Sequence, residues 1–267
     1  MNDQPLRFAT FLAPGIYPVY EFIAQYVGQR LGRPAQLAVG RSYDEFEDGR
    51  TDLGFICGLP YVMLARREPP PVEPLAAPVL QGERYGGKPV YYSDIIVRRS
   101  SPFKSFEDLR GARWAYNEED SQSGYGITRD RLLQMGETSG YFGQAVPSGF
   151  HQESIQMVCS AQVDASAIDS QVLAVAFRDD PGLVLQLRVI DTLGPSTIQP
   201  VVAASRLSAK LKAEIRSALL GMADDPSARE RLAEAFIDRF VPVTDADYEG
   251  IRKQLAAAEE AGFFELK

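Results

Sequence analysis

Short apolar runs and helical apolar stripes alternate along the first 80 residues of the chain. Continuous apolar runs predict strands at 6–12, 35–39, 52–57 and 75–80. Between them, apolar residues at helical spacing predict helices over 17–31 and 61–67. Strands and helices in this order predict a mainly parallel sheet with helices packed on it.

The same alternation starts again after a polar, glycine-containing segment at 81–88. Strands are predicted at 89–98, 112–116, 144–147, 163–168 and 183–190, with helices at 151–159 and 170–177. A last strand is predicted at 199–204, followed by helices over 208–221, 226–236 and 246–261. The chain therefore reads as an α/β protein with two lobes, 1–89 with 200–267 and 90–199. The two crossings, near 91–97 and 199–203, are expected to form a hinge.

Two serines stand where the strand at 112–116 gives way to a helix that begins near Ile127. Ser121 and Ser123 flank Gln122, and Gly124 and Tyr125 follow. The first N–H groups of a helix have no internal acceptor and carry partial positive charge, so they can bind an oxyanion. A serine there can also act only as the N-cap of the helix. Both interpretations stay open on this motif alone.

Asp169 occupies a similar position, directly after the strand at 163–168. In open α/β sheets ligands bind beyond the carboxyl ends of the strands, so Asp169 and the two serines are expected to face one cleft between the lobes. Asp169 can also simply cap the helix that starts at Ser170. Asp52 and Asp164 precede corresponding strands of the two series and are interpreted as turn residues.

Charge and composition exclude several functions. The chain has 267 residues, a net charge of −8 and a pI near 4.9, which argues against a nucleic-acid partner. A small anion is still possible, because backbone N–H groups and hydroxyls can hold it. No apolar run is long enough to span a bilayer, and Cys57 and Cys159 lack the spacing of a metal site or redox pair. No cofactor and no metal are expected.

Several short motifs, in order along the chain, together resemble the phosphate/phosphite/phosphonate-binding proteins of ABC importers. These motifs are GRTDLGF at 49–55, YYSDIIV at 91–97, FEDLRG at 106–111, SQSGY at 121–125, HQESI at 151–155 and QVDA at 162–165. The resemblance implies the two-lobed type II periplasmic-binding-protein fold, with mixed sheets flanked by helices and a ligand cleft between the lobes. It also implies ABC permease subunits as partners.

In this family a Ser-Thr-Ser run at a helix start, a tyrosine and a histidine hold the phosphonate oxygens. Carried over by motif, the resemblance assigns Ser121, Ser123, Tyr91 and His151 to the ligand. The N–H groups around Ser123 to Tyr125, including that of Gly124, belong to the same expected site, and an aspartate at the position of Asp169 can face the other end of the ligand. His151 is the only histidine; without the resemblance it reads as a packed helix-start residue.

The chain departs from the family pattern at the middle of the run, where Gln122 replaces the threonine. A ligand preference shifted from simple alkylphosphonates is therefore expected. Family members are normally exported or lipid-anchored, whereas Met1 to Pro5 does not read as a signal peptide. The expected location is periplasmic if a leader has been removed and cytoplasmic otherwise.

Three functions are compatible with these features. The first is a non-catalytic binding protein that delivers a small oxyanion to a permease. The second is an enzyme on the same fold, such as a thiamin-pyrimidine-synthase relative, which would need a reactive lysine near a histidine; a Ser/His/Asp hydrolase lacks the Gly-x-Ser-x-Gly elbow here. The third is a cytoplasmic ligand-sensing module, which the reading frame upstream of Met1 would separate from an importer component.

Overall fold

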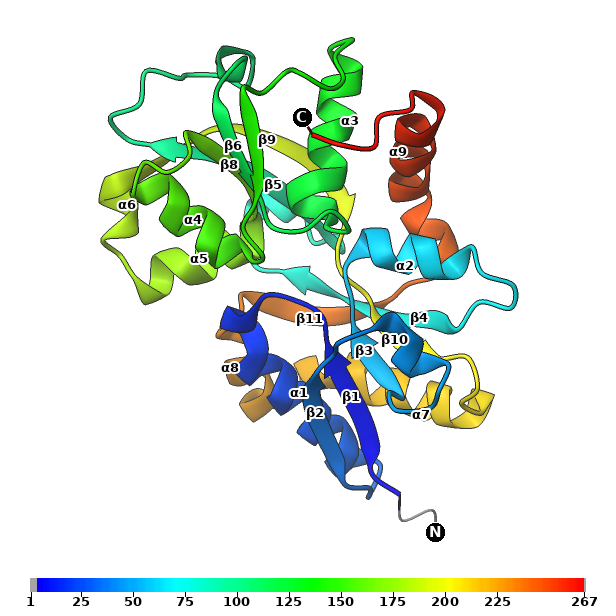
Figure 1. The fold of residues 1–267 in the computed structure, drawn as a ribbon. Coiled ribbons are helices and arrows are strands. Elements are labelled where there is room, and N and C mark those ends of the chain that lie inside the picture. Colours follow the sequence, from blue (N-terminus) through cyan, green and yellow to red (C-terminus); the bar gives the residue numbers. More distant parts are fainter. Residues whose placement is uncertain (1–3, 267) are drawn as a thin grey trace. The chain divides into compact units, whose positions relative to one another are not determined.

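The computed structural model describes residues 4–266, and these form two compact units (Figure 1). Unit 1 contains the chain up to Val90 together with Thr197–Glu249, and unit 2 contains Tyr91–Ser196 together with the segment from Gly250 onward. The sequence prediction assigned all of 200–267 to the first lobe. The end of the chain groups with unit 2 instead: the Phe263 carbonyl accepts from the Arg129 guanidinium at 3.0 Å, and the Phe264 carbonyl accepts from the Tyr125 hydroxyl at 2.6 Å.

Unit 1 is built on a six-stranded sheet of order β11-β4-β10-β3-β1-β2. Its strands are β1 (Leu6–Thr10), β2 (Ala35–Val39), β3 (Leu53–Phe55), β4 (Val72–Leu80), β10 (Val201–Ala204) and β11 (Ile237–Pro242). Its α-helices are α1 (Tyr17–Arg30), α2 (Gly58–Ala65), α7 (Ala209–Leu220) and α8 (Pro226–Ala233). Short 3-10 helices lie at Pro14–Ile16, Tyr43–Phe46, Glu83–Tyr85, Gly221–Asp224 and Asp245–Tyr248.

The sheet of unit 1 is mixed. β1 runs parallel to β2 and β3, as the βαβ order predicts. β10, which comes from the far end of the chain, enters between β3 and β4 and is antiparallel to both. β11 adds to the outer side of β4, again antiparallel. The family resemblance implied mixed sheets, and this is confirmed.

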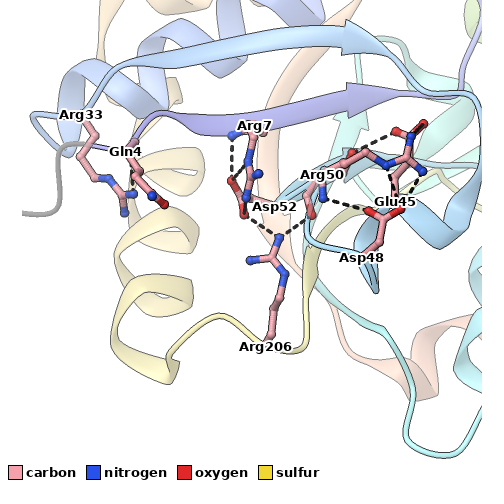
Figure 2. Close-up of polar contacts among 9 residues, drawn as sticks. Gln4, Arg7, Arg33, Glu45, Asp48, Arg50, Asp52 and Arg206 are labelled. Atoms are coloured by element: carbon pink, nitrogen blue, oxygen red, sulfur yellow. Dashed lines mark hydrogen bonds and ion pairs between the residues drawn. The ribbon is translucent and has the colours of Figure 1, made fainter.

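An aspartate joins the first and third strands of unit 1 (Figure 2). Asp52, directly before β3, accepts the Arg7 backbone N–H at 3.0 Å and two guanidinium bonds from the same residue, both at 3.0 Å. Arg206 adds a bond to Asp52 Oδ1 at 2.7 Å. The carboxylate thus fixes the start of β1 against β3 and is more than a turn residue.

Unit 2 has a five-stranded sheet of order β7-β6-β8-β5-β9. Its strands are β5 (Val90–Arg98), β6 (Arg113–Tyr116), β7 (Gln144–Pro147), β8 (Ala165–Asp169) and β9 (Leu187–Thr197). Its helices are α3 (Ile127–Gln134), α4 (His151–Cys159), α5 (Ser170–Asp179), α6 (Leu183–Gln186) and α9 (Glu249–Glu260), with a 3-10 turn at Glu107–Leu109 and a π-helical turn at Gln122–Gly126. The first residue of β5, the last of β9 and the first of α9 belong to unit 1.

The two faces of this sheet carry separate apolar cores, because successive residues of a strand point to opposite sides. Trp114 and Tyr116 pack on one side with the start of α3 and with Phe263 of the C-terminal tail. Ala115, between them, packs on the other side with residues of α4 and α5. Helices cover both faces, as the α/β pattern predicts.

Unit 2 repeats the strand-start contact of unit 1. Asp164, just before β8, accepts the Arg113 backbone N–H at 2.9 Å and guanidinium bonds at 3.1 and 2.8 Å. Arg113 begins β6, which is parallel to β8 as β1 is to β3. In both units, an aspartate before one strand therefore bonds to an arginine at the start of a parallel strand and fixes the two strands together. Within residues 4–266 Asp164 bonds to one arginine and Asp52 bonds to two.

Two predicted elements differ from the structure. The helix expected over 226–236 ends at Ala233, and Phe236 has a left-handed φ of 56°, which stops helical winding. The chain then forms β11, a strand that the pattern did not predict. The strand expected over 183–190 begins only at Leu187, because Leu183–Gln186 forms one helical turn, and it continues to Thr197.

Substitution of Asp52 by alanine is expected to lower the free energy of unfolding by roughly 2–4 kcal/mol, because it leaves a strand-start N–H and two guanidinium groups without their acceptor. Asp164→Ala is the matched variant and should cost less, since Asp164 holds one arginine and is more exposed. Urea unfolding of both variants measures the difference. Equal stability of Asp52→Ala and wild type would contradict this role.

The contact of Asp52 with Arg7 and Arg206 should also make the stability of the protein depend on acidic pH. Burial raises the pKa of Asp52, but the hydrogen bonds from Arg7 and Arg206 outweigh it, so the pKa lies below its usual range. A lowered folded-state pKa gives stability that is present above the unfolded value of about 3.9 and is lost as the pH falls through the folded value. Asp52→Asn should therefore lose less stability than wild type over that acidic range.

Candidate oxyanion site in unit 2

The predicted site residues come together at one edge of the unit 2 sheet. β6 is parallel to both β7 and β8, so the three strands end at the same edge. The turn that holds the two serines follows β6, and His151 opens α4 shortly after β7. Asp169 ends β8, and antiparallel β5 starts at this edge with Tyr91 near its beginning. The topology thus explains why residues far apart in the sequence lie at one edge.

Ser121 organises the turn that leads into α3. Its hydroxyl accepts the Gly124 N–H at 3.1 Å, and its carbonyl accepts the N–H groups of Tyr125 at 3.2 Å and Gly126 at 2.8 Å. The last of these bonds spans five residues, which makes the turn π-helical, a form that often occurs at functional sites. Ser121 is therefore the N-cap, and the Gly124 and Tyr125 N–H groups that were expected to meet an anion bond within the turn.

Gly124 packs closely against Asn117, just after the end of β6. A Cβ atom at this position would lie 2.0 Å from Asn117 Oδ1 and 3.3 Å from the Asn117 backbone nitrogen. A side chain there would force the Asn117 side chain to move and would crowd the Asn117 backbone nitrogen. Gly124 therefore lets the turn that carries both serines fold back onto its own strand.

Ser123 contacts both the imidazole of His151 and the hydroxyl of Ser121. Its Oγ lies 2.7 Å from His151 Nε2 and 3.3 Å from Ser121 Oγ. None of these three residues is more than 5% exposed. Burial lowers the pKa of His151 to about 3, so the imidazole is neutral at physiological pH. Two hydroxyls and a neutral imidazole form a cluster that is polar and uncharged.

Tyr91 and Asp169 lie on the neighbouring strands. Both are buried, and Asp169 pairs with Ser93, two residues after Tyr91, so the three side chains share a face of the sheet. Asp169 Oδ1 accepts the N–H groups of Gln171 and Val172 at 2.8 and 3.3 Å. Asp169 is thus the N-cap of α5, the alternative that the sequence left open.

Gln122 contacts a helix from the end of the chain. Its side chain is 1% exposed, and its amide nitrogen donates to Gln254 Oε1 of α9 at 2.7 Å. Nothing in the local sequence around Gln254 indicated this contact. Sequence reasoning missed it because the two residues are 132 positions apart and Gln254 lies on a helix with an ordinary amphipathic pattern.

Acidic residues precede the turn. Burial raises the pKa of Glu118 and of Asp120, and the charge of Asp120 raises that of Glu118 further. These carboxylates add negative potential near the cluster, so an anion there would need short, direct hydrogen bonds. Over residues 4–266 no group of three or more histidine, cysteine or acidic side chains could hold a metal ion.

Two α/β units, each with a mixed sheet flanked by helices, define the class of type II periplasmic binding proteins. The family model described as "ABC transporter, phosphonate, periplasmic substrate-binding protein" matches residues 14–248. The chain belongs to this family of solute-binding proteins. Among the residues that the structure describes, no helix is both long and apolar enough to cross a bilayer.

Solved structures share the fold. A binding protein component of an ABC phosphonate transporter from Pseudomonas aeruginosa has a TM-score of 0.85 at 17% identity, over 98% of this chain and 88% of that one. PhnD1 from Prochlorococcus marinus, in complex with methylphosphonate, has a TM-score of 0.80 at 19% identity, over 98% and 99%. A Xanthomonas citri protein bound to ATP has a TM-score of 0.74 at 19% identity, over 98% and 99%.

The imidazole of His151 is expected to titrate with a pKa of about 3, well below its ordinary 6.5, and NMR can measure this without ambiguity because the chain has one histidine. The unfolded chain then binds a proton below about pH 6.5 that the folded protein does not, so stability should fall on acidification from there towards about pH 3. A His151→Gln variant should lack this part of the slope. An imidazole that titrates near its ordinary value in the folded protein would contradict the buried environment.

Proposed function

We propose that the protein captures a small tetrahedral oxyanion, a phosphonate, phosphite or phosphate, for an ABC importer. The observation that carries the proposal is the buried cluster of Ser121, Ser123 and His151 at the carboxyl edge of the unit 2 sheet. Family membership and the methylphosphonate and ATP in two structural neighbours support a ligand that contains phosphorus and oxygen.

The proton on His151 decides how the cluster would act. A neutral imidazole has one N–H, and if it is on Nε2 it donates to Ser123 Oγ. The Ser123 hydroxyl hydrogen is then free to donate to an anion, and the Ser121 hydroxyl hydrogen can do the same while its oxygen accepts from Gly124. Hydrogen bonds from such donors to a charged oxygen are the strong kind. Tyr91, the Ser123 N–H group and Asp169, for the far end of the ligand, complete the proposed site, whereas the Gly124 and Tyr125 N–H groups bond to Ser121.

The replacement of the family threonine by Gln122 bears on ligand choice. The amide nitrogen of Gln122 bonds to Gln254, so the loop offers one hydroxyl fewer than a Ser-Thr-Ser run. We therefore expect the preference among phosphorus oxyanions to differ from that for simple alkylphosphonates.

The structure lacks, among the residues it describes, the carboxylate that a Ser/His/Asp hydrolase would place on its histidine. In a Ser/His/Asp triad a carboxylate accepts from the second nitrogen of the histidine and orients it. Here His151 Nδ1 is buried and has no hydrogen-bond partner in the part of the chain that the structure describes. Binding without turnover is the function that this geometry favours.

The family description favours a periplasmic location and a permease partner, and we propose both. A cytoplasmic sensor built on the same fold is the alternative. Fractionation of cells that produce the native gene product separates the two: recovery in the periplasm supports import, and exclusive recovery in the cytoplasm supports the sensor.

Substitution of Ser123 by alanine should weaken anion binding roughly tenfold to a hundredfold, because one hydrogen bond to a charged oxygen contributes about 1.5–3 kcal/mol. Calorimetry against phosphate, phosphite, methylphosphonate, 2-aminoethylphosphonate and sulfate measures the change. Ser208→Ala is a matched control, since Ser208 caps α7 of unit 1 by accepting the Leu211 N–H. The site is wrong if no anion of the panel binds, or if Ser123→Ala binds as tightly as wild type.

Purified protein should release no phosphate from phosphonates or phosphate esters, with or without divalent metal ions, because no residue that the structure describes orients His151 as a general base. A colorimetric phosphate assay over hours is sufficient. Steady release that disappears in His151→Ala would establish catalysis and refute the binding-protein assignment.

A further inference from the structure

Three side chains form a hydrogen-bonded chain from the proposed ligand turn to the last helix and back to α3. Gln122 Nε2 donates to Gln254 Oε1 at 2.7 Å, and Gln254 Nε2 donates to Asp130 Oδ2 at 3.0 Å. Gln134 Nε2 donates to the same oxygen of Asp130 at 2.8 Å. Gln254 is thus the bridge between the turn and the helix that follows it.

The carboxylate of Asp130 fixes which group donates and which accepts in each of these hydrogen bonds. An ionised carboxylate can only accept hydrogen bonds, so Asp130 requires the amide nitrogen of Gln254 to point towards it. The oxygen of Gln254 must then point towards Gln122, which in turn must present its nitrogen. Asp130 therefore sets the orientation of an amide that lies within the proposed anion-binding turn, although it does not touch that amide itself.

The place of Gln122 in the turn gives this contact its importance. Gln122 lies between the two serines of the cluster, and its backbone carbonyl accepts the Ile127 N–H at the end of the π-helical turn. A shift of Gln122 would therefore move Ser121 and Ser123 together. The contact to Gln254 holds the middle residue from the side, whereas the bonds of Ser121 to Gly124 and of Ser123 to His151 hold the flanking positions.

The helix that supplies Gln254 also joins the two units along the chain. α9 begins at Glu249, which belongs to unit 1, and continues from Gly250 in unit 2. Just before it, Tyr248 is fully buried and donates to the Ile198 carbonyl of unit 1 at 3.1 Å. The segment that bonds to the ligand turn is therefore anchored, a few residues earlier, within unit 1.

We propose that Gln254 is a positioning residue for oxyanion binding: through Gln122 it holds the ligand turn in its binding geometry, and it couples that turn to α9. The residue does not itself contact the anion. This inference rests on the proposed function and adds a residue and a segment to it. By reciprocity, an anion that orders the turn should also order α9.

Exchange of the amide of Gln254 with the carboxylate of Asp130 tests this series of hydrogen bonds. Gln254→Glu alone places a second carboxylate against Asp130 and should weaken binding. Gln254→Glu combined with Asp130→Asn restores the chain with the carboxylate and the amide exchanged, because the carboxylate introduced on α9 would accept from both Gln122 and the introduced asparagine. Net charge is the same in the double variant as in wild type, so the comparison isolates the hydrogen bonds.

Calorimetry with phosphate and methylphosphonate gives the affinities. Gln254→Ala should weaken binding about threefold to tenfold, as expected for the loss of a neutral hydrogen bond. Gln134→Ala is the matched control, since it removes the other donor to Asp130 from an exposed position, and should change affinity less than about twofold. The swap variant should bind within about twofold of wild type and clearly more tightly than Gln254→Glu.

Hydrogen exchange adds a readout that a merely structural role would not change. Anion binding should slow amide exchange in α9 of the wild type, and this protection should be lost in Gln254→Ala. If wild type binds anions but Gln254→Ala binds equally well, or the swap does not improve on Gln254→Glu, the inference fails and the proposed function stands. If wild type binds no anion of the five used with Ser123→Ala, both fail. Should Gln254→Ala not fold, the comparison of Gln254→Glu with the swap variant decides.

Discussion

A helix that starts in a buried environment must satisfy its first N–H groups without water, and this requirement shapes the proposed site. Ser121 meets most of it alone: its hydroxyl and carbonyl accept three successive N–H groups, from Gly124, Tyr125 and Gly126. The turn is therefore tight, and Gly124 lets it fold against Asn117 without displacing that side chain. Within this frame Ser123 is held against the buried imidazole of His151.

The charges near the proposed site do not attract an anion over long range, so recognition there would depend on the directions of hydrogen bonds. The chain carries a net charge of −8, and acidic residues directly precede the turn. Long-range steering would therefore work against an anion. The proposed donors are uncharged and buried, so they stabilise a ligand only through short hydrogen bonds whose directions must match its oxygens. A neutral His151 fits this scheme, because the role proposed for it is to orient the Ser123 hydroxyl and it adds no positive charge.

The sequence predicted the parts of the structure that depend on local pattern or on strand order. The strands that end beside Ser121, His151 and Asp169 were predicted, and the rule for carboxyl ends of parallel strands grouped their residues correctly at one edge. The strand β11 was missed because its two buried residues, Ile237 and Phe240, do not alternate as a half-buried strand requires.

Contacts between distant positions could not be predicted. Asp52 and Asp164 were recognised as corresponding residues, but their bonds to Arg7 and Arg113 span 45 and 51 positions. The assignment of α9 to unit 2 depends on bonds such as that of Gln254 to Gln122. Such pairs are fixed by the packed fold, and a periodicity read along one segment carries no information about them.

A crystal structure of the protein with the anion that binds most tightly tests the central claim most directly. The account predicts a tetrahedral anion at the carboxyl edge of the unit 2 sheet, with one of its oxygens within hydrogen-bonding distance of Ser123 Oγ, while Ser123 Oγ stays bonded to His151 Nε2. An anion bound elsewhere, with the Ser121, Ser123 and His151 cluster unchanged and without contact to it, would contradict the account.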